Sequence, residues 1–176
     1  MVADEPTLAL ELILIEVALN RLGYRTASNP PLGELFVEMA DDRQFQQGRV
    51  STHQLLVRSL TLNGDDGPAS RLMTFDLAYP LDVPELLRAD VLQALPQLAG
   101  QLVLGHFELD DDASLHMRYS MLIDSIAPLS DEILLQIFSL LDYQQLHFGD
   151  YLEEMCAGRL TADVLPDVMA EAEGDD

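Results

Sequence analysis

The sequence predicts an α+β fold in which a twisted, largely antiparallel sheet carries helices packed on it, in the order helix, three strands, helix, two strands, helix. Three observations support this prediction. Apolar residues recur at helical spacing over residues 8–22. Two later blocks alternate apolar and polar residues on either side of turn-forming sequences, as hairpins do. Ser130, followed by two acidic residues, opens a final helical pattern.

The first predicted helix is apolar on two sides. At 100° per residue, the stripe that can cover the protein's own core comprises Leu8, Leu12, Ile15, Leu19 and Leu22. The second stripe comprises Leu10, Ile13, Leu14 and Val17. Gly23 is a favourable C-terminal cap and predicts the end of the helix. Leaving the second stripe in water would forgo roughly 1.5 to 3 kcal/mol per side chain, so we expect something to cover it.

Three strands are predicted next. Residues 35–40 form a short strand, and the apolar residues of 51–63 form a longer one. The polar stretch 41–49 between them predicts a loop. Residues 63–67, with the sequence Asn-Gly-Asp-Asp-Gly, predict a hairpin turn. In the return strand, 72–79, alternate residues are apolar, which is typical of a strand with one face on a core.

A second helix and a second hairpin follow. Asp82 is predicted to cap the helix and Gly100 to end it. The hairpin has apolar residues alternating over 103–109, a turn at 110–112 made of three aspartates, and a return strand over 115–123. The face of that strand opposite its apolar residues carries His116, Arg118 and Ser120.

The last predicted helix begins after Ser130 and stops at Gly158. Residues 159–176 are acidic and poor in aromatic side chains, so we expect a flexible tail that does not pack. A chain of 176 residues suits one domain. The sequence therefore predicts a single α+β domain over residues 1–158, followed by an acidic tail.

The charged residues are overwhelmingly acidic. Nine arginines and no lysines oppose 31 acidic residues, which gives a net charge of −22. Because nucleic acids and anionic membranes attract basic proteins, neither is an expected partner. Glu11 and Glu16 interrupt the first apolar run, which argues against a membrane span. A lone cysteine, Cys156, and an N-terminus without a basic region before its apolar run predict a cytoplasmic protein.

Particular sequences in the second half carry a resemblance to known families. They are Gly105-His106-Phe107-Glu108-Leu109-Asp110, Leu115-His116-Met117-Arg118-Tyr119-Ser120, Leu129-Ser130-Asp131-Glu132 and the segment 150–158. This part resembles the YbjN family of bacterial sensory transduction regulators. The predicted order of elements, the size and the acidity resemble type III secretion chaperones, which are small acidic dimers. The resemblance implies a chaperone-like fold and a regulatory or chaperone-like role, and it supplies no catalytic residue.

The sequence contains none of the common catalytic or cofactor-binding motifs. It has no nucleophile elbow, phosphate-binding glycine loop or dinucleotide fingerprint, so we predict no catalytic residue and no cofactor. His106 and His116 could face each other across the second hairpin and share an ion with Glu108, but no compact ligand spacing supports a metal site, and none is predicted. Arg118 predicts either an ion pair on the outer sheet face or a contact with a partner's carboxylate.

These observations predict a non-enzymatic, chaperone-like or regulatory protein that captures an apolar segment of a partner. The predicted partner-binding residues are Leu10, Ile13, Leu14, Val17 and Arg118. The partner is another protein or a second copy of this chain, unless the first helix buries both stripes within one chain. The alternative is a small ligand-binding or enzymatic domain that uses His106, His116 and Arg118 on the outer sheet face.

Overall fold

This computed structural model describes residues 5–40, 52–62, 70–124 and 129–173. Its helices are α1 (Glu5–Arg21), η1 (Pro30–Leu32), η2 (Glu85–Leu87), α3 (Arg88–Ala99), α4 (Asp131–Cys156) and α5 (Leu165–Glu173). Its strands are β1 (Arg25–Asn29), β2 (Glu34–Ala40), β3 (Thr52–Leu62), β4 (Ser70–Asp82), β5 (His106–Leu109) and β6 (Ser114–Asp124). All strand pairs are antiparallel, in the order β1-β2-β3-β4-β6-β5. The predicted α+β class is confirmed.

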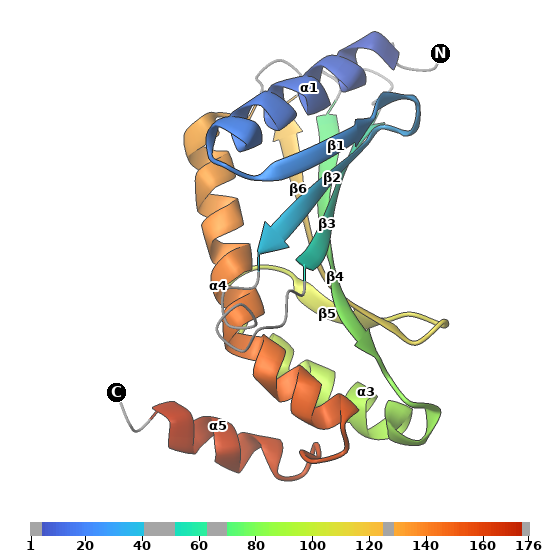
Figure 1. The fold of residues 1–176 in the computed structure, drawn as a ribbon, viewed down its shortest axis with the longest axis vertical. Coiled ribbons are helices and arrows are strands. Elements are labelled where there is room, and N and C mark those ends of the chain that lie inside the picture. The colour runs from blue at the N-terminus through green and yellow to red at the C-terminus, as the bar shows by residue number, and fades with distance from the viewer. Residues whose placement is uncertain (1–4, 41–51, 63–69, 125–128, 174–176) are drawn as a thin grey trace.

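The sheet has one covered face and one open face. Register partners in a row across the covered face are Leu35, Val57, Phe75 and Tyr119. The helix α4 runs along this face, where the ring of Phe138 meets that of Phe75 at a centroid distance of 6.2 Å. The helix α1 lies across the end formed by β1, β2 and β3 (Figure 1). The core therefore lies between the sheet and these two helices, and no described helix covers the opposite face.

The strand β1 is an element that the sequence analysis missed. Its sequence, RTASN, has no large apolar residue, and its side chains are exposed or half-buried. Gly23 follows α1 with φ of 95°, a left-handed conformation that only glycine adopts freely, and turns the chain back. The chain then pairs along β2 as an edge strand. Backbone pairing rather than side-chain pattern therefore specifies β1.

The C-terminal segment corrects the prediction of an unpacked tail. Leu160, Ala162, Leu165 and Met169 are buried, and the last two belong to α5. The segment is held by α3: Gln97 Nε2 donates to the Ala162 carbonyl over 3.2 Å, and the Ala162 amide donates to the Asp90 carboxylate. The apolar residues of this segment therefore pack although acidic residues lie between them. Residues 174–176 of the predicted tail lie outside the described residues.

The predicted starts of the second helix and of the second hairpin were wrong. Asp82 does not cap a helix, because it still pairs with Ser114 as the last residue of β4. The residue before α3 is Leu87, whose side chain makes no capping hydrogen bond. The strand expected from Val103 begins only at His106. The predicted loop at 41–49 and hairpin turn at 63–67 lie outside the described residues.

The predicted caps of α4 are confirmed. The Ile133 amide donates to Ser130 Oγ over 3.3 Å, and Gly158 follows the helix with φ of 69°. Because the Ser130 hydroxyl satisfies an amide that has no partner within the helix, we expect Ser130→Ala to lower the free energy of unfolding by about 1 kcal/mol. Urea denaturation measures this loss. Ser139→Ala, at an exposed position in the interior of the same helix, is the matched control and should cause no loss.

Candidate functional site

The two apolar stripes of α1 differ in exposure. In the first stripe, Leu12, Ile15 and Leu19 are completely or almost completely buried, as predicted. Leu22 is an exception, because α1 ends at Arg21 and Leu22 is 42% exposed. In the second stripe, Ile13, Leu14 and Val17 are 42%, 48% and 42% exposed. The side chains of Leu8 and Leu10 lie outside what the structure describes.

The second stripe exposes less apolar surface to a partner than the sequence predicted. Because more than half of Ile13, Leu14 and Val17 is already covered, burying the rest would gain less than half of 1.5 to 3 kcal/mol each, or about 2 to 4 kcal/mol for the three. Association itself costs about 4 to 15 kcal/mol. The stripe can therefore serve as the apolar centre of an interface, but a partner must also contact the surface around it.

A buried ion pair sets how α1 lies on the sheet. Glu11 is 3% exposed, and its Oε2 lies 2.7 Å from Nη1 of Arg71 on β4. The hydroxyl of Ser59 on β3 donates to the same oxygen over 3.2 Å. Burial raises the pKa of Glu11, while the charge of Arg71 and the hydrogen bonds oppose that rise. The pair anchors one side of α1, which leaves the second stripe turned away from the core.

The open sheet face carries a chain of ion pairs centred on Asp76. This carboxylate, 7% exposed, accepts from Arg118 through Nη2 at 2.9 Å and Nε at 3.2 Å. Its other oxygen lies 2.8 Å from Nδ1 of His116. Arg118 also pairs with Glu108, which in turn lies 2.7 Å from Nε2 of His106. Four of these side chains come from the second hairpin, and Asp76 comes from the neighbouring strand.

The two histidines, which could have faced each other across the second hairpin, do not do so. In the register of the hairpin, His106 is opposite Arg118, and Glu108 is opposite His116. His106 and His116 therefore lie two register positions apart, and different carboxylates contact them. Among the described residues, no group of three or more His, Cys, Asp or Glu side chains is arranged to hold a metal ion.

Arg118, a predicted partner contact, is engaged within the protein. Partial burial tends to lower its pKa, but the hydrogen bond and charge of Asp76, together with the charges of Glu108 and Asp110, raise it. A partner carboxylate would have to compete with these groups. The role of Arg118 in partner binding stays a prediction. Cys156 is half-buried, and burial raises the pKa of its thiol, which disfavours a reactive thiolate at neutral pH.

The open sheet face also exposes apolar side chains. Leu60 and Leu122 are 58% and 64% exposed and flank the half-buried Leu72 in a register row across β3, β4 and β6. This row is a second apolar surface, separate from α1. Among the described residues, no helix is both long enough and apolar enough to span a bilayer.

Two comparisons with known proteins found no match. No protein-family model matches the chain, and no curated protein matches it. The resemblance to YbjN-like regulators and type III secretion chaperones therefore stays a prediction. Any account of function depends on the surfaces described above.

Proposed function

We propose that this protein is a non-enzymatic, chaperone-like or regulatory protein that binds an apolar segment of a partner through α1. The observation that supports the proposal is the partial exposure of Ile13, Leu14 and Val17 on a helix whose other apolar stripe is buried. Three neighbouring aliphatic side chains on a rigid helix form the apolar centre that a protein interface needs. The Glu11–Arg71 pair holds this helix in one orientation.

The net charge suits a protein that carries an exposed apolar surface. At −22, copies of the chain repel one another at long range, which opposes non-specific aggregation. The same field would accelerate the approach of a basic partner. Because the same charge would repel nucleic acid and anionic membrane surfaces, we do not propose either as a partner, and a cytoplasmic location stays a prediction.

A second copy of the chain is the simplest partner that would cover the stripe. In a two-fold symmetric dimer, α1 of one protomer would pack on α1 of the other, and each stripe would cover its counterpart. A stable interface usually buries about 800 Å² per partner, so surface beyond the three residues would take part. A client protein that inserts its own apolar segment would compete for the same surface.

The alternative, an enzymatic or ligand-binding site formed by His106, His116 and Arg118, has less support. These side chains share the open sheet face, as the alternative requires, but each one is paired with a carboxylate of the protein. Such a chain of ion pairs has an ordinary explanation as a solvent-facing network between strands. We therefore favour protein binding.

The Leu14→Asp/Val17→Asp double variant tests the proposal. Because a bound partner would have to desolvate two carboxylates in place of two aliphatic side chains, we expect self-association, or affinity for a captured partner, to fall by at least about 30-fold. Sedimentation velocity measures self-association. Affinity capture from the native lysate, with the affinity of each captured protein then measured in purified form, reports other partners.

The matched control is Leu86→Asp/Val164→Asp, which makes the same chemical change at exposed positions away from α1. Both double variants should keep the circular dichroism spectrum and the thermal midpoint of the parent protein. If the α1 variant is folded and its association and captured partners equal those of the parent, the proposed function is wrong. If the control variant loses binding as severely, the surface involved is not α1.

A further inference from the structure

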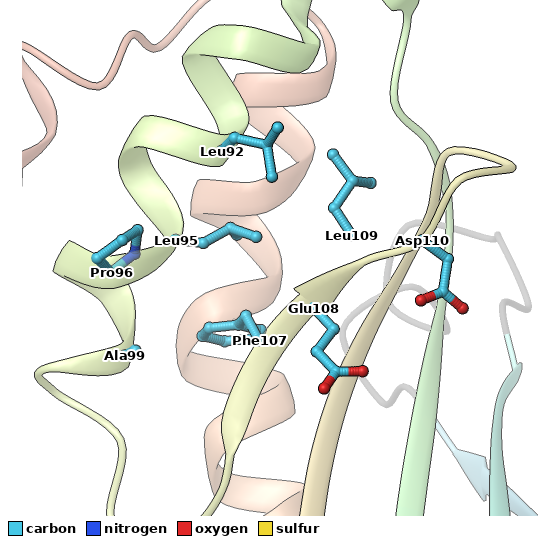
Figure 2. Close-up of a pocket in the computed structure, with 8 residues that line it drawn as sticks. All are labelled: Leu92, Leu95, Pro96, Ala99, Phe107, Glu108, Leu109 and Asp110. Atoms are coloured by element: carbon cyan, nitrogen blue, oxygen red, sulfur yellow. The ribbon is translucent and has the colours of Figure 1, made fainter.

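An open hollow of about 420 Å³ lies between α3 and β5. Figure 2 shows Leu92 and Leu95 on α3, Phe107 and Leu109 on β5, and the space between the two elements. Leu95 and Phe107 are buried, and Leu92 at the rim is 46% exposed. The lining residues are mostly apolar, and Glu108 and Asp110 also border the hollow. The hollow is wide enough for one large aliphatic side chain of another molecule.

The backbone of β5 is suited to pairing beside this hollow. β5 is the last strand of the sheet, and no described strand lies beyond it. The Asp110 amide donates to the Ser114 carbonyl over 3.0 Å, so positions 110, 108 and 106 form the hydrogen-bonded pairs with β6. Phe107 and Leu109, which alternate with them, direct their backbone N–H and C=O groups away from β6. An extended segment could pair with these groups.

The charge around the hollow favours a basic occupant. Glu108 and Asp110 line it, and the exposed Asp111 and Asp112 follow in the turn. Two nearby arginines are already engaged: Arg88 donates to the Asp110 carbonyl, and Arg118 pairs with Glu108. The whole chain carries −22. A lysine or arginine beside the inserted apolar side chain would therefore bind in a favourable field.

We propose that the hollow between α3 and β5 is a groove that binds an extended segment of a partner protein. The segment pairs with the edge of β5 and inserts one large apolar side chain between Leu92 and Leu109. It places lysine or arginine next to Glu108 and Asp110. This inference shares with the proposed function only the idea of a protein partner. It uses a different surface, so variants of α1 do not affect it.

A short synthetic peptide tests the inference. The probe is the acetylated, amidated pentapeptide Thr-Lys-Leu-Arg-Val, titrated into the full-length, isotope-labelled protein while amide chemical shifts are followed by nuclear magnetic resonance. We expect saturable shifts centred on the amides of Phe107 and Leu109. Peptides in which alanine replaces leucine or glutamate replaces both basic residues should each bind about tenfold more weakly, because each removes one contribution. The peptide with proline in place of leucine lacks both the inserted side chain and the backbone N–H, so it should bind more weakly than the alanine peptide.

Two protein variants localise the effect. Leu92→Asn/Asp110→Asn should weaken binding of the probe by about tenfold. Its matched control, Leu122→Asn/Asp167→Asn, changes the same residue types at exposed positions outside the groove and should leave affinity unchanged. Leu14→Asp/Val17→Asp should bind the probe as the parent does, whatever the result of the test of α1.

Three results would overturn the inference. The first is the absence of saturable shifts at millimolar peptide. The second is equal binding of the leucine and alanine peptides, which would mean that charge alone attracts the probe. The third is a set of shifts centred on α1 or on the open sheet face, which would place peptide binding elsewhere and leave the proposed function of α1 unaffected.

Discussion

The Arg71→Met variant is expected to lose about 3 to 5 kcal/mol of the free energy of unfolding. Arg71 is buried, and its Nη1 lies 2.7 Å from the Glu11 carboxylate, which is also buried under α1. Removing the guanidinium leaves a negative charge in the core, where the Ser59 hydroxyl is its remaining hydrogen-bond donor among the described residues. Urea denaturation at pH 7 measures the loss.

The double variant Glu11→Leu/Arg71→Met separates the ion pair from the packing. Because an apolar pair of similar volume needs no desolvation of charge, we expect the double variant to recover most of the stability that Arg71→Met loses. The matched control for the arginine is Arg58→Met, at an exposed position whose side chain pairs with Glu34 on the sheet surface, and it should change stability by less than about 1 kcal/mol. A double variant as unstable as Arg71→Met would contradict this explanation.

The loss in Arg71→Met should also depend on pH. Burial raises the pKa of Glu11 above its usual value of 4.5, so ionisation of this group opposes folding. The contribution of Glu11 to the free energy of unfolding is therefore largest below pH 4.5, and it is lost as the pH rises through the pKa of the folded state. Without Arg71, that folded-state pKa rises further. The deficit relative to the parent should therefore shrink between pH 7 and pH 5. A deficit that is constant or that grows on acidification would rule out an unpaired Glu11 as the cause.

The sequence predicted those parts of the fold that local pattern determines. The spacing of Leu12, Ile15 and Leu19 predicted the buried side of α1, and alternation predicted the covered face of β6. Gly23, Ser130 and Gly158 predicted helix ends because capping depends on one residue. β1 was missed because an edge strand needs no apolar pattern, and α5 was missed because the acidity of the segment outweighed its apolar residues in the prediction.

The candidate surfaces were predicted less completely. Helix geometry identified the second stripe of α1 but not the fraction of each side chain that remains exposed, which depends on the elements around it. Glu11 was interpreted only as an interruption of the apolar run, because its partners Arg71 and Ser59 come from distant strands. Asp76 was missed for the same reason. Its pairing with His116 and Arg118 depends on the register between β4 and β6, which the sequence does not specify.

The side-chain amide of Gln144, which is fully buried, explains why β5 begins at His106 and not at Val103. On α4, its Oε1 accepts from the amides of Val103 and Leu104, each over 2.8 Å, and its Nε2 donates to the Leu104 carbonyl over 3.1 Å. Gly105 follows with φ of 78°, and a Cβ there would collide with the Arg118 carbonyl. The segment therefore pairs with a side chain of α4 instead of extending the strand.

Gln144→Leu should lower the free energy of unfolding by about 2 to 4 kcal/mol. Leucine fills the same space but forms no hydrogen bonds, so two backbone amides and one carbonyl lose their partner. Hydrogen exchange should accelerate at Val103 and Leu104 specifically. The matched control, Gln136→Leu, makes the same change at an exposed position of α4 and should stay within about 0.5 kcal/mol of the parent. Because the segment leads directly into β5, the variant should also weaken probe binding at the groove. Unchanged exchange at both amides would mean that other groups hold the segment in place.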